Sequence, residues 1–446
     1  MFVPALAVSI VLFVVLLVVW RLSLPNPGAS DVSCSPARPV REPQVAWAAL
    51  PCVLQRLDQT VSQMPSSGEQ YLIVGAGFLG CRIAAALVRR GETHIRCADL
   101  SCSKQLKRLM RQAADCIQFV QCDICNAASM IGACTGARTV FATAALLRFW
   151  EAHEHQWPAF QAVNVDAVDL LLRACKECGV ARLIYTSTSN VAVSSVHASS
   201  FPCGEPTVLT EASPLVTPGD AINHYSLSKA AAELTVLAAN DHVHGGGSMR
   251  PDGLLTASVR PCSGIFGLGD TNHVDACFSG AKLAVPVPWA ITDFIHVDNV
   301  VWGHLLCEAG LRQHPAVVGG EAFAITNRDP LSHNEWNHLL KHYAESCPAL
   351  GVPRVGIEYP PMWLLAVLAW FVDRVTLLSR GHLRLGSTMC KLTRATLQLV
   401  HCHYIYDDSK AARILGYSPI VSLEEGIMAS FWELAQHSAE ELNPRN

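Results

Sequence analysis

Three closely spaced glycines constrain this chain more than any other feature of its sequence. Gly75, Gly77 and Gly80 follow the apolar run 71–74 and open a segment with helical periodicity. A G-x-G-x-x-G run between a strand and a helix lets backbone amides approach a pyrophosphate at the helix N-terminus. The sequence therefore predicts a nicotinamide dinucleotide site. Its predicted phosphate-binding residues are Gly75, Gly77, Phe78, Leu79 and Gly80.

Asp99 lies about 20 residues after the last of these glycines, at the end of the second predicted strand. A carboxylate at this place accepts hydrogen bonds from the hydroxyls of the adenosine ribose and repels a 2′-phosphate. Asp99 therefore favours NAD over NADP. Arg96 lies nearby and could contact a 2′-phosphate, so NADP stays the less favoured alternative.

Short apolar runs alternate with helical segments from residue 71 onward, which is typical of a parallel sheet covered by helices on both faces. We therefore predict an α/β fold, a Rossmann-type doubly wound parallel sheet. The expected strands are 71–75, 93–98, 117–121, 138–143, 182–187 and 256–260, and the expected helices are 78–90, 160–178 and 224–240.

The rest of the chain is predicted to add an N-terminal membrane anchor helix and a smaller C-terminal region that covers the substrate. Residues 242–253 contain three consecutive glycines and are expected to be a surface insertion. The predicted segments are an anchor over 1–20, a linker over 21–68, the NAD-binding domain over 69–265, the C-terminal region over 266–430 and a tail over 431–446.

The anchor is predicted from Phe2 to Trp20, a stretch without a charged residue. At about 1.5 Å per residue it spans roughly the hydrocarbon thickness of a bilayer. Arg21, Arg38 and Arg41 follow it and no Lys or Arg precedes it, which places the enzyme on the cytosolic side. A cleaved signal peptide is the alternative, but the basic start of such a peptide is missing.

A second apolar stretch, 362–372, includes Trp363, Trp370 and Phe371. Its eleven residues are too few to span a bilayer. Two interpretations stay open at this point: a helix in the membrane interface, which the aromatic residues favour, and a buried core helix.

Composition narrows the class of partner. Charged residues make up 16% of the chain and the formal net charge is -4, so the sequence carries no basic surface for nucleic acid. The mean hydropathy of +0.26 is high and favours a membrane or a lipophilic substrate.

Eighteen scattered cysteines indicate a reducing compartment. The pairs Cys122/Cys125 and Cys175/Cys178 are predicted to be free thiols rather than a zinc site, and no metal is expected.

A second motif, Tyr225-x-x-x-Lys229, supplies the expected chemistry. Residues four apart lie on one face of a helix. A tyrosine has an ordinary pKa near 10, so it can act as a base near neutral pH only beside a fixed cation such as Lys229. Spacing alone is weak evidence, but the glycine motif and the strand that ends in the run Tyr185 to Ser189 strengthen it.

Together these residues give the chain a resemblance to the extended short-chain dehydrogenases/reductases, and within them to the 3β-hydroxysteroid dehydrogenase/isomerase family. The resemblance covers roughly residues 70 to 430. Several of its motifs also occur in nucleotide-sugar epimerases. The motifs that carry it are Val74 to Gly80, Cys122-Asp123-Ile124, Phe141 to Ala145, Tyr185 to Val191, Tyr225/Lys229, Arg260 to Gly267, Phe294 to Val300 and Tyr404 to Tyr417.

The resemblance implies a role for each of the reacting residues. Tyr225 is the expected acid/base, and Lys229 is expected to hold the nicotinamide ribose and to lower the pKa of Tyr225. Alignment on Val191 places Thr188 as the hydroxyl that orients the substrate oxygen, where the family more often has Ser. A shift of one residue would give this role to Ser187 or Ser189. Asp123 is expected beside the adenine, with a turn role as its alternative.

The resulting hypothesis is a membrane-bound oxidoreductase that oxidises a 3β-hydroxyl of a steroid or sterol with NAD. The resemblance implies the endoplasmic reticulum, with the catalytic domain facing the cytosol, and leaves open an isomerase or decarboxylase activity and a homodimer. Two alternatives remain. A nucleotide-sugar epimerase or dehydratase would purify with bound NAD, and a non-catalytic NAD-binding membrane protein would tolerate loss of Tyr225.

Overall fold

The computed structural model describes residues 40–199, 205–241, 253–270, 273–274, 277, 282–350, 354–383, 385–386 and 388–442. Within these residues the central sheet has seven strands, all parallel, in the order β3-β2-β1-β4-β5-β7-β12. The strands are β1 (Tyr71–Val74), β2 (Ile95–Asp99), β3 (Ile117–Gln121), β4 (Thr139–Ala142), β5 (Arg182–Thr186), β7 (Leu255–Pro261) and β12 (Glu321–Ile325). This confirms the predicted Rossmann-type sheet.

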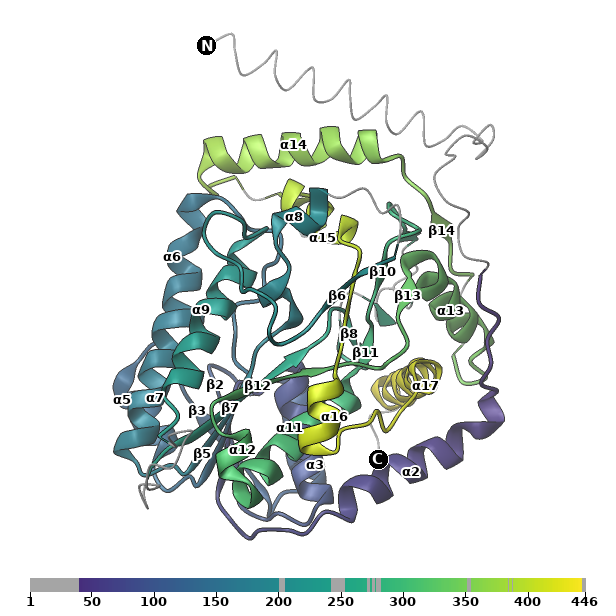
Figure 1. The fold of residues 1–446 in the computed structure, drawn as a ribbon. Coiled ribbons are helices and arrows are strands. Elements are labelled where there is room, and N and C mark those ends of the chain that lie inside the picture. Colours follow the sequence, from purple (N-terminus) through teal and green to yellow (C-terminus); the bar gives the residue numbers. More distant parts are fainter. Residues whose placement is uncertain are drawn as a thin grey trace. The chain divides into compact units, whose positions relative to one another are not determined.

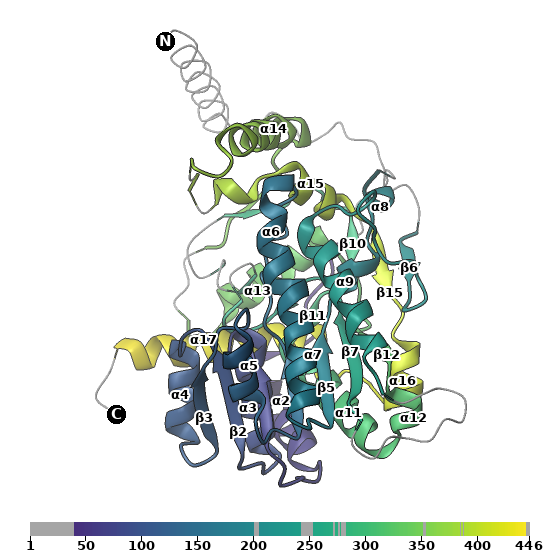
Figure 2. The same cartoon turned by 90° about the vertical axis from the view of Figure 1, so that its left-hand side faces the viewer.

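Helices cover both faces of the sheet, as Figures 1 and 2 show. Every residue of β1 is buried, as is typical of a parallel strand packed on both faces. One layer contains α5 (Ala127–Cys134), α6 (Trp157–Phe160), α7 (Ala167–Glu177) and α9 (His224–Ala238). The opposite layer contains α2 (Leu50–Ser62), α3 (Phe78–Arg89), α4 (Lys104–Gln112), α11 (Val297–Gln313) and α12 (Pro315–Val318).

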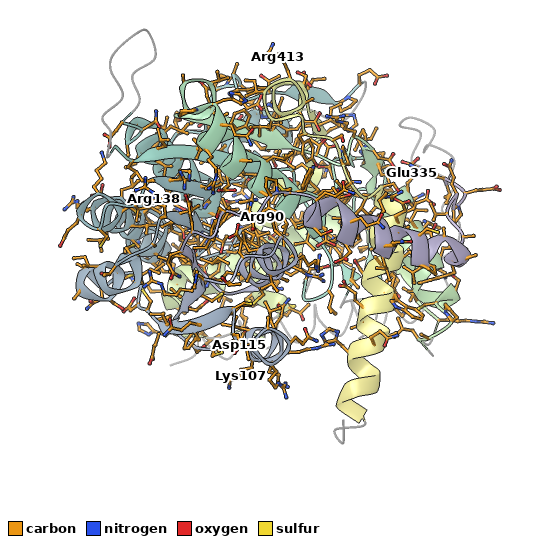
Figure 3. All side chains as sticks on the ribbon, turned by 90° about the horizontal axis from the view of Figure 1, so that it is seen from below. Arg90, Lys107, Asp115, Arg138, Glu335 and Arg413 are labelled. Carbon is orange, nitrogen blue, oxygen red and sulfur yellow. The ribbon has the colours of Figure 1, made fainter. Side chains whose placement is uncertain are left out.

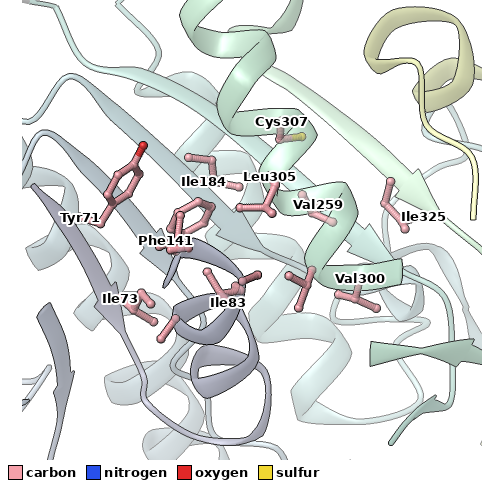
Figure 4. Packing of buried hydrophobic residues seen from close by; sticks show 14 of the residues in the cluster. Tyr71, Ile73, Ile83, Phe141, Ile184, Val259, Val300, Leu305, Cys307 and Ile325 are labelled. Carbon is pink, nitrogen blue, oxygen red and sulfur yellow. The ribbon is translucent and has the colours of Figure 1, made fainter. Parts of the chain in front are cut away.

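The main core lies between the sheet and the layer that includes α3 and α11 (Figure 4). Ile73 and Phe141 project from neighbouring strands, Ile83 of α3 lies next to them, and Val300 of α11 belongs to the same buried cluster. All four are fully buried. This packing holds α3 against the sheet and α11, and thereby positions the turn between β1 and α3.

Charged residues close the amino-terminal edge of the sheet, which Figure 3 shows from below with Arg90 near the centre. The Arg90 guanidinium donates to a carboxylate oxygen of Glu308 over 2.9 Å and to the Tyr71 hydroxyl over 2.6 Å. These groups are buried and satisfy one another. The order of strands reverses between β1 and β4, and ligands of such sheets bind beyond the opposite, carboxyl-terminal edge at that point.

The C-terminal half contributes a strand and a covering helix to the sheet, neither of which was predicted from the sequence. β12 lies in the predicted C-terminal region, yet it pairs in parallel with β7, and α11 covers the sheet from the same region. The five-residue run of β12 was missed because strict alternation is lost after about residue 265. The helices α4 and α5 were also not predicted.

The predicted linker over 21–68 contains an ordered helix. In α2, Leu50, Val53, Leu57 and Val61 follow helical spacing and are buried, and the helix packs against α17 (Leu423–Leu442). Helix α17 begins before the predicted tail and runs into it. Each of these amphipathic helices buries its apolar face against the other, although nearly the whole chain separates them.

Besides α11 and α12, the C-terminal region contributes to four short strand pairs and begins five more helices within the described residues. The pairs are β6 (Thr207–Leu209) with β15 (Tyr404–Tyr406), β8 (Ile265–Phe266) with β11 (Ile295–His296), β9 (Leu283–Ala284) with β14 (Ile357–Glu358), and β10 (Ile291–Thr292) with β13 (Leu331–Ser332). The helices are α13 (His333–Ser346), α14 (Met362–Ser379), α15 (Arg394–His401), α16 (Ser409–Leu415) and α17, and α8 (Ser195–Ser199) lies near α15 (Figure 1).

The apolar segment 362–372 forms the first part of α14, which lies at the outer edge of the domain in both views (Figures 1 and 2). Three residues of the helix, Leu364, Ala369 and Val372, are buried. Trp363 is 67% exposed and Trp370 52% exposed. The interpretation as a buried core helix is therefore wrong. By length and composition α14 could cross a membrane.

Two predictions fall outside the described residues. The anchor over 1–20 is one, together with the linker as far as residue 39. The surface insertion over 242–253 is the other, except for its last residue.

Candidate active site

The glycine turn lies between β1 and α3, and its three glycines have different environments. Gly75 has a φ of +99°, and a Cβ there would overlap the backbone of Ala144. A Cβ on Gly80 would overlap the carbonyl oxygen of Gly75. In contrast, a Cβ on Gly77 would have no heavy atom within 4 Å. Gly75 and Gly80 therefore leave no room for a side chain, whereas there is free space beside Gly77, which precedes the first residue of α3.

This open space fits the pyrophosphate of a dinucleotide. The N-terminus of α3 offers unpaired backbone amides and a partial positive charge to it. Phe78 and Leu79 form the first turn of the helix. Leu79 packs against the core, and the Phe78 ring lies against Gly267 and Gly269, so this turn also contacts the loop after β8.

Asp99 ends β2 and is bonded to the glycine turn. Its Oδ2 accepts a hydrogen bond from the backbone amide of Ala76 over 2.8 Å, and its Oδ1 accepts one from Leu100 over 2.7 Å. The carboxylate is thereby fixed beside the turn, at the carboxyl end of the neighbouring strand. This is where the hydroxyls of an adenosine ribose lie in a Rossmann site.

Asp123 follows β3 and is exposed. Its Oδ1 accepts a hydrogen bond from the backbone amide of Cys125 over 2.9 Å, which is the geometry of an Asx turn. The alternative turn role of Asp123 therefore has a structural basis. Its expected place beside the adenine stays a prediction.

Tyr225 and Thr188 meet above the carboxyl end of the sheet. Asn223 caps α9 by accepting a hydrogen bond from the Ser226 amide over 2.8 Å, which places Tyr225 in the first turn of the helix. The side chain of Thr188 lies close to the Tyr225 hydroxyl. Burial raises the pKa of Tyr225 to about 12, and the nearby Thr188 side chain opposes this rise.

The structure thus brings Thr188, rather than its neighbours, to Tyr225. The hydroxyls of Ser187 and Ser189 are buried and have no hydrogen-bond partner among the described residues. Alternate residues of an extended chain face opposite sides. A shift of one residue would therefore turn the hydroxyl away from Tyr225.

Lys229 lies one turn after Tyr225 on α9 and is 3% exposed. Its Nζ donates a hydrogen bond to the carbonyl oxygen of Thr186 over 2.5 Å and lies 4.0 Å from the centre of the Tyr185 ring. In this arrangement Thr188, not Lys229, is the group that opposes the rise in the pKa of Tyr225. Burial lowers the pKa of Lys229 itself to about 7, and the Glu233 carboxylate opposes that change.

The lowered pKa of Lys229 gives a prediction for stability. The unfolded chain binds this proton up to its ordinary pKa, whereas the folded protein loses it above about pH 7. Stability should therefore rise with pH from about 7 to 10. Lys229→Met should raise the free energy of unfolding at about pH 7 by several kcal/mol and remove this rise with pH.

Urea denaturation of the protein at several pH values measures this effect. Lys176→Met is the matched control, because Lys176 is exposed and pairs with Asp241 over 3.1 Å. An unchanged slope of stability against pH in Lys229→Met would contradict the prediction.

Sequence reasoning missed the residues that hold the reacting groups from a distance. Asn164 lies in a π-helix, Gln161–Asp166, and donates to the Ser228 hydroxyl of α9 over 2.9 Å. Tyr404 and Tyr406 of β15 bond to the loop that contains Thr188. Tyr404 and Tyr406 carry a local signal, because they alternate on a strand, but no spacing in the sequence predicts which loop that strand contacts.

The described cysteines are free thiols. Cys122 is buried, whereas Cys125 is exposed. Among the described residues, no group of three or more His, Cys, Asp or Glu side chains is arranged to hold a metal ion.

Comparison with known proteins identifies the family. The model of the 3-beta hydroxysteroid dehydrogenase/isomerase family matches residues 72–349. The chain belongs to this family. It is an oxidoreductase of the 3β-hydroxysteroid dehydrogenase type, which acts on a CH–OH group with a nicotinamide dinucleotide.

Two curated relatives and one solved structure illustrate the similarity. The chain is 31% identical to the 3beta-hydroxysteroid-dehydrogenase/decarboxylase isoform 1 of Arabidopsis thaliana, over 80% of this chain and 78% of that protein. It is 28% identical to the decarboxylating sterol-4-alpha-carboxylate 3-dehydrogenase of Mus musculus, over 80% and 88%. The fold is similar to that of UDP-glucose 4-epimerase from Thermotoga maritima, with a TM-score of 0.57, 18% identity and coverage of 83% and 99%.

Proposed function

We propose that the enzyme oxidises the 3β-hydroxyl of a sterol or steroid with NAD, and that Tyr225, Thr188 and Lys229 do this chemistry. The observation that carries the proposal is the proximity of the Thr188 side chain to the Tyr225 hydroxyl, in a chain that also has an open glycine turn. The names of the two curated relatives support a sterol as the substrate.

In the proposed reaction, Tyr225 accepts the proton of the substrate hydroxyl, and Thr188 donates a hydrogen bond to the same oxygen. The chemistry that a bound nicotinamide supplies is acceptance of the hydride from the carbinol carbon. Lys229, whose pKa is lowered by burial, holds the nicotinamide ribose. The residues of the glycine turn and Asp99 bind the rest of the dinucleotide.

The test is NADH formation by the purified protein with a panel of 3β-hydroxysterols, with and without a 4-carboxylate. Wild type should form NADH with at least one of them, and Tyr225→Phe should not. Release of CO2 from the 4-carboxylates would add the decarboxylase activity. Equal rates for wild type and Tyr225→Phe with every sterol would reject the proposal. A protein that copurifies with NAD and converts UDP-sugars would instead be an epimerase.

The preference for NAD over NADP rests on the fixed carboxylate of Asp99. A 2′-phosphate would meet this negative charge, and Asp99 cannot turn away without losing its bonds to Ala76 and Leu100. Asp99→Asn keeps the shape of the side chain and removes the charge. We expect it to reduce the ratio of kcat/KM for NAD to that for NADP by about tenfold or more, as for a repulsive charge pair in a specificity site. An unchanged ratio would contradict the role of Asp99.

The proposal includes a membrane, and the exposed face of α14 supports it. Trp363, Val367, Trp370 and Leu377 are spaced by four, three and seven residues, so they lie on one face of the helix, and Leu378 borders this face. Each is at least 45% exposed. Aromatic residues on an amphipathic helix are typical of the membrane interface.

The other contacts of α14 favour a helix that lies along the membrane surface rather than across it. Its opposite face packs through Leu364 and Val372, and Asp373 contacts His153 over 3.4 Å and accepts a hydrogen bond from the Arg394 amide. A helix with one face on protein cannot be surrounded by lipid. The exposed Arg374, whose guanidinium lies 5.5 Å from the centre of the Trp370 ring, can reach lipid phosphates from this position.

Replacing Trp363 and Trp370 with Glu should strongly weaken binding to vesicles of phosphatidylcholine and phosphatidylserine. Residues 38–446 form a compact unit, so flotation of this part isolates the effect of α14 from that of the anchor. Val317→Glu is the matched control, because Val317 is 51% exposed on α12, on the far side of the domain (Figure 1). If the double variant and Val317→Glu bind vesicles equally, α14 does not contact the membrane.

The proposed anchor over 1–20 would hold the enzyme in the endoplasmic reticulum with the catalytic domain in the cytosol. Full-length protein should then resist extraction by alkaline carbonate, and intact microsomes should not protect residues 40–442 from protease. Protection of this part would indicate the opposite orientation, with the catalytic domain in the lumen.

Light scattering of the detergent-solubilised protein measures its mass and so tests the proposed homodimer.

A further inference from the structure

Two tyrosines on the short strand β15 approach the loop that contains Thr188. Tyr404 and Tyr406 are two residues apart on a strand, so their side chains lie on the same face. Both are buried, at 2% and 6% exposure. β15 is held from the other side by parallel pairing with β6 and by Asp293, whose Oδ2 accepts a hydrogen bond from the Tyr406 amide over 2.7 Å.

Both tyrosine hydroxyls donate to the loop. The Tyr406 hydroxyl donates to the carbonyl oxygen of Ser189 over 2.5 Å, and that of Tyr404 donates to the side-chain oxygen of Asn190 over 3.1 Å. The backbone amide of Asn190 in turn donates to the hydroxyl oxygen of Thr188 over 3.3 Å. A continuous set of hydrogen bonds therefore links β15 to the hydroxyl that contacts Tyr225.

A third segment joins this network at Asn190. The Ser263 hydroxyl, in the loop after β7, donates to the same side-chain oxygen over 2.9 Å and also contacts the Tyr404 hydroxyl. Burial raises the pKa of both Tyr404 and Tyr406, so each stays a neutral donor at physiological pH. The loop is thus held by uncharged bonds that do not change with pH in the working range.

The loop needs such support, because it follows the end of β5 and forms a short 3-10 helix, Ser189–Ala192, outside the sheet. A hydroxyl must stay within hydrogen-bond reach of the reacting oxygen, and a displacement of about 1 Å can reduce the rate 10²-fold. Tyr404 and Tyr406 come from a strand about 200 residues further along the chain.

From this geometry we propose that Tyr404 and Tyr406 are positioning residues for Thr188. They hold Ser189 and Asn190, and thereby keep the Thr188 hydroxyl against Tyr225. The inference rests on the proposed acid/base role of Tyr225, but not on a sterol as the substrate.

Tyr406→Phe and Tyr404→Phe remove only the hydroxyls. Tyr417→Phe is a matched control, because Tyr417 is equally buried and its hydroxyl donates to the carbonyl oxygen of Thr326 over 2.7 Å, away from the loop. We expect the first two variants to lower kcat by roughly tenfold or more, with the KM for NAD within about twofold of wild type. The acid limb of their pH profile should move to higher pH, because Thr188 opposes the rise in the pKa of Tyr225.

A double-mutant cycle tests whether the effect passes through Thr188. In a Thr188→Ala background, Tyr406→Phe should change kcat less than about twofold, because the hydroxyl that it positions is already missing. A full tenfold loss in that background, or an equal loss in Tyr417→Phe, would overturn the inference and leave a general structural role.

Hydrogen exchange of the peptide 187–193 gives a readout that needs no turnover. It should be faster in Tyr406→Phe and Tyr404→Phe than in wild type and unchanged in Tyr417→Phe. Equal exchange in all the proteins would overturn the proposal even if the enzyme is active. Faster exchange in an enzyme that oxidises no sterol would reject the proposed substrate and support the positioning role.

Discussion

Tyr225→Phe should lower kcat for NADH formation by about 10²- to 10⁴-fold, the usual contribution of a general acid/base. The substitution removes the hydroxyl that lies close to Thr188 and keeps the ring. The neighbouring hydroxyls of Ser187 and Ser189 are buried without hydrogen-bond partners among the described residues. The KM for NAD should change little, because the glycine turn and Asp99 are untouched.

Steady-state kinetics and thermal unfolding together check this prediction. Tyr359→Phe is the control, because the Tyr359 hydroxyl also donates to a side chain, Asn334, over 2.7 Å, but at the surface of the C-terminal region. It should keep wild-type kcat, and both variants should unfold within a few degrees of wild type. If Tyr225→Phe retains more than about a tenth of the wild-type kcat, Tyr225 is not the acid/base of the reaction.

The parts of the site that the sequence predicts are those in which neighbouring residues act together. The glycine turn needs only β1, its glycines and α3, and Tyr225 and Lys229 need only one helix face. The family resemblance proposed Thr188 for the substrate oxygen, and its side chain lies close to Tyr225. Lys229 illustrates the limit, because its bond to the Thr186 carbonyl depends on how α9 lies against β5.

The parts that the sequence could not predict depend on contacts between distant segments. The buried residues of α2 follow helical spacing, but the partner that buries them, α17, is at the other end of the chain. β12 is a short run that becomes a strand by pairing with β7. For the same reason, the alternation of Tyr404 and Tyr406 says nothing about Ser189 until the fold brings β15 and the loop together.

Exchange of single glycines by alanine should separate folding from cofactor binding. In Gly80→Ala the new methyl group would overlap the carbonyl oxygen of Gly75, which is backbone and cannot rotate away. Overpacking of this kind usually costs 1–3 kcal/mol, and a clash with backbone lies at or above the top of that range, so we expect a loss of about 3 kcal/mol or more. The turn itself should be distorted, and NAD binding should be lost with it.

Gly77→Ala is the informative partner, because its methyl group would meet no heavy atom within 4 Å and the backbone there has a negative φ of -83°. Its stability without cofactor should equal that of wild type. NAD at about 100 times its Kd should stabilise wild type by about 2.7 kcal/mol, but should not stabilise Gly77→Ala, whose methyl group occupies the space proposed for the pyrophosphate. Urea denaturation with and without NAD, together with calorimetric titration, measures the stability and the NAD affinity of each variant.

Wild-type NAD affinity in Gly77→Ala would show that the dinucleotide does not approach this glycine. Wild-type stability in Gly80→Ala would show that the turn can rearrange.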